Sequence, residues 1–196
     1  KPIVAALHGT VLGGGLEVAL GVHYRVAVPK TRMGLPEVTL GLLPGAGGTQ
    51  RLPRAIGVDA AIDLITSGRQ IDAATALELG LIDAVLEGSP RAAGEAEARR
   101  LLAEGRGPRR LSEAPAPAAD PDVVAAWRSK VQRTARGQVA PMRALDCIVG
   151  GLDLPFADGM AQERQGFMDL MQTPERAALI HAFFAERRAA QLDDLV

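Results

Sequence analysis

Two patterns of apolar and polar residues divide the chain near its middle. In the first half, continuous apolar runs of strand length at residues 3–7 and 24–28 flank a glycine-rich turn and a short helix, which we expect over residues 16–22. Residues 31–38 are expected to be extended, because Pro36 disfavours a helix around it. The first half therefore begins with a strand, a turn, a helix and a second strand.

Helical spacing appears further along the chain. Residues 58–66 are apolar at helical positions and are expected to stop at Gly68, and Asp72 is the expected N-cap of a helix that ends at Gly80. Two more segments complete this half, namely a glycine-rich loop at 41–48 and a last strand at 81–86.

The second half is rich in alanine, arginine and glutamate and is predicted to be almost wholly helical. A capping residue followed by proline marks three helix starts, because the first turn of a helix leaves its amides unpaired in any case. These pairs are Ser89-Pro90, Asp120-Pro121 and Thr173-Pro174. Residues 105–121 are expected to form a mobile surface loop between helices.

Two late helices carry apolar stripes, which usually pack against a core. One stripe contains Met160, Phe167, Leu170 and Met171, and the other contains Leu179, Ile180, Phe183 and Phe184. We expect core packing for both. The adjacent phenylalanines leave a second role open for the terminal helix, in which it covers a neighbour's pocket or a subunit interface.

Composition and charge narrow the class of protein. The 196 residues are 47% hydrophobic, and 22 basic residues balance 23 acidic ones without a long basic run, so nucleic acid is not expected as a partner. No apolar stretch approaches the roughly 20 residues that cross a bilayer, so no membrane span is expected. The single Cys147 is expected to be a small core residue in a reducing compartment, from which we predict a cytoplasmic location. The three scattered histidines show no metal-ligand spacing, so no metal site is expected.

A glycine-rich turn and two glutamates are the candidates for chemistry. Gly13-Gly14-Gly15 precedes a helix, whose unpaired N–H groups suit a carbonyl oxygen that becomes anionic during a reaction; the alternative is a tight turn of structural use alone. Taken singly, Glu17 fits a surface carboxylate that stabilises the helix dipole, and Glu37 a solvated residue. Together with the turn they form a minimal set for adding or removing water across a bond conjugated to a carbonyl.

An ordered series of motifs carries a resemblance to a known family. The motifs are Lys1-Pro2-Ile3-Val4-Ala5-Ala6, His8-Gly9, Leu12-Gly13-Gly14-Gly15-Leu16-Glu17, Arg25-Val26-Ala27, Gly34-Leu35-Pro36-Glu37-Val38, residues 41–53 and Gly80-Leu81-Ile82-Asp83. Through them the chain resembles the enoyl-CoA hydratase/isomerase (crotonase) family over residues 1–87. The helical remainder is similar to the hydratase region of bifunctional or multifunctional fatty-acid β-oxidation enzymes, through residues 133–141, Leu154-Pro155-Phe156, Glu163-Arg164 and residues 182–187.

The resemblance implies an α/β fold, in which a crotonase-like spiral of ββα units is followed by a helical C-terminal region. Residues 1–87 would be the C-terminal part of the spiral core with its active-site turns, and residues 88–196 a helical region that covers the site and makes subunit or interdomain contacts. In relatives, a segment ahead of the strand at Lys1 supplies a second oxyanion amide and much of the CoA contact surface. The 196-residue piece alone is therefore not expected to be an autonomous enzyme.

The resemblance also implies roles for single residues. Glu37 delivers the proton to the α-carbon, Glu17 activates and orients water, and the Gly14 N–H donates to the thioester oxygen. The positions that match substrate- or water-positioning residues are Gly13, Pro36 and Gly45. The implied activity is syn addition of water to a trans-2-enoyl-CoA, giving a 3-hydroxyacyl-CoA. No cofactor is expected, because coenzyme A is part of the substrate.

Alternatives and partners follow from the same resemblance. Retention of both glutamates favours a hydratase over a pure isomerase, in which one of the pair is typically replaced. A dual activity, another crotonase-type acyl-CoA reaction such as enoyl-CoA isomerisation, and a non-catalytic crotonase-like assembly subunit stay open. The expected partners are an acyl-CoA thioester, further copies of the chain in a trimer or hexamer, and a 3-hydroxyacyl-CoA dehydrogenase.

Overall fold

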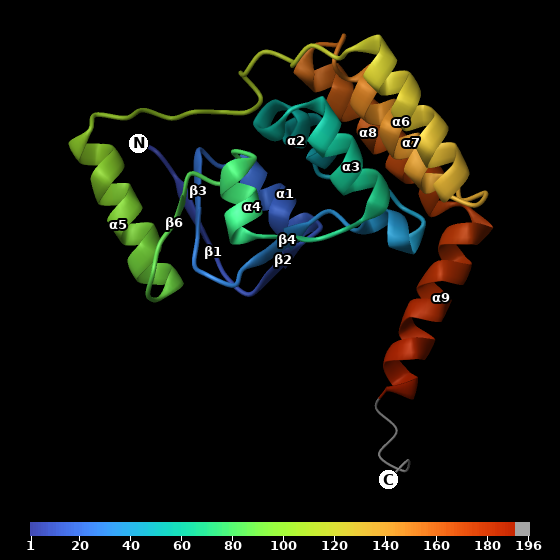
Figure 1. Ribbon diagram of the computed structural model, residues 1–196, viewed down its shortest axis with the longest axis horizontal. Coiled ribbons are helices and arrows are strands. Elements are labelled where there is room, and N and C mark those ends of the chain that lie inside the picture. The colour runs from blue at the N-terminus through green and yellow to red at the C-terminus, as the bar shows by residue number, and fades with distance from the viewer. Residues whose placement is uncertain (191–196) are drawn as a thin grey trace.

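Two small sheets organise the first half of the protein. The structure is a computed structural model that describes residues 1–190. One sheet is parallel and has the order β1 (Val4–Leu7), β3 (Tyr24–Ala27), β6 (Ala84–Val85). The other has the order β2 (Thr10–Leu12), β4 (Arg32–Gly34), β5 (Ile71–Asp72), with β2 and β4 parallel and β4 and β5 antiparallel (Figure 1).

The chain advances by steps of two strands and a helix. β1 and β2 are followed by α1 (Gly14–Gly21), after which β3 returns beside β1 with Val4 opposite Tyr24. β3 and β4 are followed by α2 (Gly48–Ile56) and α3 (Val58–Ser67), and β5 by α4 (Ala73–Glu78) and β6. All four residues of β3 are buried, as expected for a central parallel strand. The predicted α/β class is confirmed.

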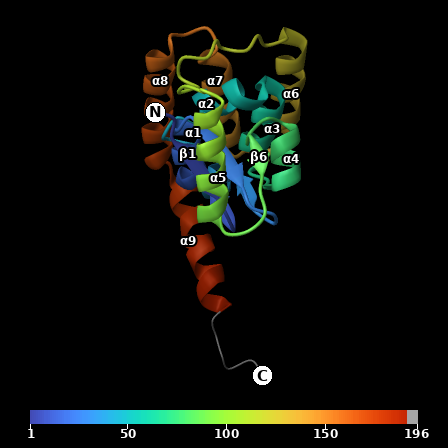
Figure 2. The same cartoon turned by 90° about the vertical axis from the view of Figure 1, so that its left-hand side faces the viewer.

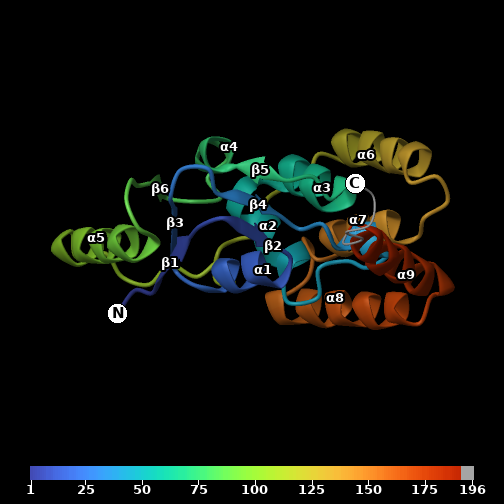
Figure 3. The ribbon, with the colours of Figure 1, turned by 90° about the horizontal axis from the view of Figure 1, so that it is seen from below.

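The helices of the second half lie at opposite ends of this core. α5 (Pro90–Ala103) packs beside β1 and β3 at one end, whereas α6 (Pro121–Thr134), α7 (Ala140–Gly150) and α8 (Phe156–Met171) pack with α2 and α3 at the other (Figures 1 and 3). α9 (Pro174–Ala189) extends away from the rest (Figure 2). The helix starts predicted at Ser89, Asp120 and Thr173 are confirmed, because each side chain accepts a hydrogen bond from a first-turn amide.

Three predicted segments differ in detail. β4 covers part of residues 31–38, but Glu37–Leu40 forms a 3₁₀ turn, η1, because Pro36 at φ −87° suits the start of a helical turn as well as a strand. The loop predicted at 41–48 ends in the first residue of α2, a helix that the pattern does not predict because Pro53 interrupts it. The strand predicted at 81–86 shrinks to β6, since its first two N–H groups donate to the Ala76 carbonyl and complete the turn after α4.

The apolar stripes predict the packing of the last two helices only in part. On α8 the buried residues are Gly159, Glu163, Gly166 and Leu170, so the most buried face is rotated from the predicted stripe. Leu170 of the stripe is buried, and Phe167 packs against the core while partly exposed. Glycines on this face let α8 lie close to α7, because a Cβ on Gly166 would lie only 3.1 Å from Cys147 Sγ. The prediction of core packing is wrong for α9, which has no buried residue and leaves Phe184 53% exposed. Its first turn packs against Gly41, and the helix then leaves the core.

A buried arginine ties the central strand to the end of α4. Arg25 is 1% exposed and donates from Nε to the Leu81 carbonyl at 2.7 Å, while its N–H donates to Asp83 at 2.8 Å. Asp83 also accepts from Arg109 at 2.6 Å, and the Tyr24 hydroxyl donates to the Gly107 carbonyl at 2.9 Å. The loop predicted at 105–121 is thus present and anchored to β3 at its beginning.

Replacement of Arg25 is expected to lower stability sharply. Arg25→Met keeps much of the volume but leaves the buried Leu81 carbonyl without its donor, so we expect the free energy of unfolding to fall by about 3 kcal/mol. The matched control Arg91→Met removes an arginine that is 90% exposed and should change it by less than about 0.5 kcal/mol. Urea unfolding of both variants measures the difference, and equal losses would contradict the role given to Arg25.

Candidate active site

The glycine turn before α1 adjoins the carboxyl group of Glu37. Gly13 is the N-cap of α1 at φ 55° and ψ −130°, a conformation that side chains rarely adopt. A Cβ on Gly13 would lie 2.9 Å from Glu37 Oε1. The Gly13 N–H donates to the Gly34 carbonyl at 3.0 Å, which joins the turn to the end of β4. The exposed Gly14 contributes the first N–H of the helix, which has no backbone acceptor among the described residues.

Glu17 is held by the backbone that leads into α2. It lies in the first turn of α1 and is 5% exposed, so the interpretation of Glu17 as a surface carboxylate is wrong. Its Oε1 accepts from the N–H groups of Ala46 at 2.7 Å and Gly48 at 2.8 Å. A Cβ on Gly48 would lie 3.0 Å from that oxygen and 2.6 Å from Pro44 Cβ, so the backbone can reach the carboxylate because residue 48 is glycine.

Glu37 is an acid with one buried oxygen that lacks a partner. It is the first residue of η1, which Pro36 precedes as N-cap. Its Oε2 is buried and has no hydrogen-bond partner among the described residues, so the interpretation of Glu37 as a solvated side chain is also wrong. Burial, with smaller contributions from the charges of Glu17 and Glu163, raises the pKa of Glu37 from 4.5 to about 7. Such a group can give and take a proton near neutral pH.

A third glutamate, Glu163 of α8, joins the site. It is fully buried and accepts hydrogen bonds from the N–H of Gly47 at 2.6 Å, the N–H of Thr49 at 2.8 Å and the Thr49 hydroxyl at 2.6 Å. Burial raises its pKa to about 7 although these bonds lower it. Reasoning from sequence did not select Glu163 as a site residue. The spacing does hold a signal, because Glu163 lies three residues after Met160 and four before Phe167 and so shares their helix face. A charged residue on an apolar face is seldom buried without a partner or a function.

The structure brings Gly13, Glu17 and Glu37 together. Gly45 lies in the same loop as the donors to Glu17 and faces the ring of Phe167, whose Cδ2 would be 2.7 Å from a Cβ at that position. The roles that the sequence resemblance assigns to these residues stay predictions. Cys147 is 1% exposed and burial raises the pKa of its thiol to about 11, which confirms it as a core residue.

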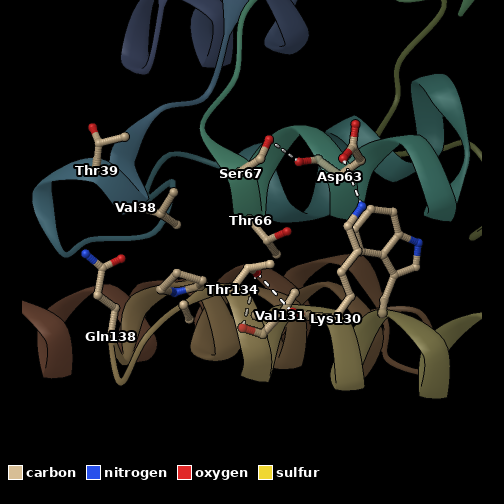
Figure 4. A pocket seen from close by; sticks show the side chains of 12 residues that line it. Val38, Thr39, Asp63, Thr66, Ser67, Lys130, Val131, Thr134 and Gln138 are labelled. Carbon is tan, nitrogen blue, oxygen red and sulfur yellow. Dashed lines mark hydrogen bonds and ion pairs between the residues drawn. The ribbon is translucent and has the colours of Figure 1, made fainter.

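A separate cavity of about 500 Å³ lies between η1, α3 and α6. Figure 4 shows Thr39 and Thr66 at its wall, together with Asp63 and Lys130, whose charged groups approach to 3.9 Å. Neither Glu17 nor Glu37 lines this cavity. Within residues 1–190, no three histidine, cysteine or acidic side chains gather in a way that could hold a metal ion. No helix in the same range is long and apolar enough to cross a membrane.

Comparison with known proteins decides the family. The family profile described as enoyl-CoA hydratase/isomerase matches residues 1–108. The chain belongs to this family. The peroxisomal bifunctional enzyme of Cavia porcellus is 45% identical to it in an alignment of 192 positions, which covers 96% of this chain and 26% of that relative. The fatty acid oxidation complex subunit alpha of Aliivibrio fischeri is 44% identical over 93% of this chain and 27% of that relative. The chain thus spans about a quarter of the curated relatives it matches.

Solved structures of the enoyl-CoA hydratase/isomerase family share the fold. Carnitinyl-CoA hydratase from Mycobacterium avium superposes with a TM-score of 0.65 at 28% identity, covering 95% of this chain and 60% of that one. The crotonase-like fold and the resemblance to bifunctional fatty-acid oxidation enzymes are therefore confirmed. One of these relatives is named as a peroxisomal enzyme and the other is a bacterial protein. The cytoplasmic location therefore stays a prediction.

The raised pKa of Glu37 predicts a pH-dependent cost in stability. The pKa of Glu37 rises from 4.5 in the unfolded chain to about 7 in the folded protein. Folding therefore costs extra free energy as the pH rises from 4.5 to 7, and the whole cost is present above pH 7. Glu37→Gln stays neutral, so at pH 8 its free energy of unfolding should exceed that of the wild type by on the order of 1 to 3 kcal/mol, with no gain at pH 4. Urea unfolding at both pH values measures this. The control Glu113→Gln changes an exposed side chain and should show no gain at pH 8. A Glu37→Gln variant that is less stable than the wild type at pH 8 would contradict the raised pKa of Glu37.

Proposed function

We propose that this chain carries the hydratase activity of its family, adding water to a trans-2-enoyl-CoA to give a 3-hydroxyacyl-CoA. One observation carries the proposal: two carboxyl groups adjoin the free amides at the start of α1. That of Glu17 is buried and fixed by backbone donors, whereas that of Glu37 is partly buried and its Oε2 has no hydrogen-bond partner among the described residues. The names of the relatives, a bifunctional enzyme and a fatty acid oxidation subunit, support the same class of substrate.

Glu17 fits the role of holding and activating the water. Two N–H donors engage its Oε1, whereas its Oε2 has no hydrogen-bond partner among the described residues. A carboxylate fixed on one oxygen presents the other in a defined direction, so a water bound there can be aimed at the β-carbon of the enoyl group. Attack forms the bond from this carbon to the water oxygen, and Glu17 takes the released proton.

Glu37 and the amide of Gly14 complete the addition. As the water attacks, the electrons of the double bond move toward the thioester oxygen, where the N–H of Gly14 stabilises the enolate charge. Protonated Glu37 then gives its proton to the α-carbon and the thioester carbonyl forms again. With a pKa of about 7, Glu37 holds a proton in a substantial fraction of molecules at neutral pH. The addition is redox-neutral, so we propose that coenzyme A enters as part of the substrate and that no oxidant is required.

The 3-hydroxyacyl-CoA product suggests the next partner. A hydroxyl group on the β-carbon is a substrate for oxidation, and the relatives include enzymes named as bifunctional. We therefore extend the proposal to a longer protein or complex in which a 3-hydroxyacyl-CoA dehydrogenase consumes the product. Assembly into a trimer or hexamer remains a prediction.

Loss of the conjugated-enoyl ultraviolet absorbance tests the hydratase activity directly. The full-length protein should remove this absorbance from a short trans-2-enoyl-CoA, and Glu37→Gln and Glu17→Gln should each lower kcat by on the order of 10² or more, because each removes a proton-transfer group. Glu97→Gln is a matched control, since Glu97 is also a buried glutamate but pairs with Arg100 on α5.

Two outcomes would count against the proposal. A folded full-length protein that leaves the absorbance unchanged is not a hydratase, and double-bond migration in a 3-enoyl-CoA would then be assayed as the isomerase alternative. Full activity in both Glu17→Gln and Glu37→Gln would show that the chemistry lies elsewhere.

A further inference from the structure

Two carboxylates from distant parts of the chain hold the start of α2 in alternation. The N–H groups of Ala46 and Gly48 donate to Glu17. The N–H groups of Gly47 and Thr49, which alternate with them along the chain, donate to Glu163. The N-cap of α2 is Gly47, which has no side chain to cap the helix. The donors that a capping side chain would satisfy are therefore satisfied from α1 on one side and from α8 on the other.

The three groups that form hydrogen bonds with the Glu163 carboxylate are all donors. The Thr49 hydroxyl accepts from Gln50 Nε2 at 3.0 Å, which directs its own proton to Glu163. Gln50 Nε2 also donates to the Cys147 carbonyl at 3.0 Å, so the Gln50 side-chain amide cannot be flipped to exchange its oxygen and nitrogen without losing that bond. If glutamine replaced Glu163, its NH₂ group would face an N–H donor, and no hydrogen bond could form there.

The two sets of hydrogen bonds are coupled through rigid peptide units. Neighbouring peptide groups are rigid and share a Cα atom, so a displacement of the groups that carry the Gly47 and Thr49 N–H also displaces those that carry the Ala46 and Gly48 N–H. Release of Gly47 and Thr49 from Glu163 would shift the N–H groups of Ala46 and Gly48, which determine where Glu17 Oε1 lies. Arg51 supports the same backbone from outside, donating from Nη1 to the Ala46 carbonyl at 2.8 Å.

We propose that Glu163 is a positioning residue for hydration: from α8 it fixes residues 46–49, and through them it sets the direction in which Glu17 presents its oxygen to water. This inference rests on the proposed hydratase function. Among the described residues, Glu163 forms no hydrogen bond with Glu37 or with the Gly14 amide, so its effect is exerted through Glu17.

Kinetics of the full-length protein test this role, with Asp169→Asn as a control on an exposed acid of the same helix. Glu163→Gln should lower kcat by about tenfold or more, because small displacements of catalytic groups are costly, and change KM by less than about twofold. It should also move the basic limb of the pH profile to lower pH. The charged groups acting on Glu37 are Glu17 from α1 and Glu163 from α8, and removal of the Glu163 charge lowers the pKa of Glu37.

Two more readouts separate positioning from stability. Glu163→Asp keeps the charge but shortens the side chain, so it should lower kcat while leaving the basic limb in place. Hydrogen–deuterium exchange of the segment that contains residues 46–49 should be faster in both Glu163 variants and unchanged in Asp169→Asn. A purely structural role would lower the melting temperature but not kcat per folded molecule.

The outcomes are distinguishable. Unchanged kcat and pH profile in folded Glu163→Gln overturn the positioning role while the hydratase function stands, and so do equal effects in Asp169→Asn. If Glu163→Gln does not fold, unchanged kcat in Glu163→Asp overturns it. A wild-type protein without hydration overturns the proposed function itself, before any variant is compared.

Discussion

Burial of the Glu17 and Glu163 carboxyl groups against the start of α2, with Glu37 close enough to feel their charges, is the constraint on which this site depends. Removing a carboxylate from water is costly, and mutual repulsion of Glu17, Glu37 and Glu163 adds to that cost. The backbone N–H groups before α2 are the available compensation, and they are divided between Glu17 and Glu163. Glu37 receives none of them and has a buried oxygen without a partner. The same constraint thus separates a fixed carboxylate from a group that exchanges a proton near neutral pH, which is the division of labour that hydration requires.

The glycine-rich sequence before α2 follows from this constraint. Two carboxylates can approach successive N–H groups only where no side chain stands between them and the backbone. A Cβ at position 48 would crowd both Glu17 and Pro44, and one at position 45 would enter the ring of Phe167. The glycines at these positions therefore reflect the packing of acids and an aromatic ring against the backbone. The same reasoning applies at Gly13, where the neighbour is Glu37.

Local signals in the sequence predict much of this structure, and long-range packing explains what they miss. Asp72, Ser89, Asp120 and Thr173 are N-caps as predicted, because capping is decided within one turn. The juxtaposition of the glycine turn with Glu37 follows from the short parallel strands β2 and β4, in which Leu12, just before the turn, lies opposite Gly34. Glu163 is 114 residues from Thr49, and its partners are backbone amides that no side-chain pattern reveals. The packed face of α8 is likewise set by what its glycines approach, and α9 has an apolar stripe but no core beside it.

The position of Glu163 also bears on how the two halves of the chain depend on each other. The family profile ends at residue 108, yet a side chain from α8 completes the hydrogen bonds of a turn inside the matched part. Residues 1–108 alone would leave the Gly47 and Thr49 donors without their acceptor, although both residues are buried in the whole structure. Similarity to the bifunctional relatives extends over 96% of the chain, as expected if the helical half is part of the geometry of the site. A relative with the Glu17 and Glu37 pair but no acid on this helix would need another acceptor at the start of α2, so the three glutamates form one physical unit.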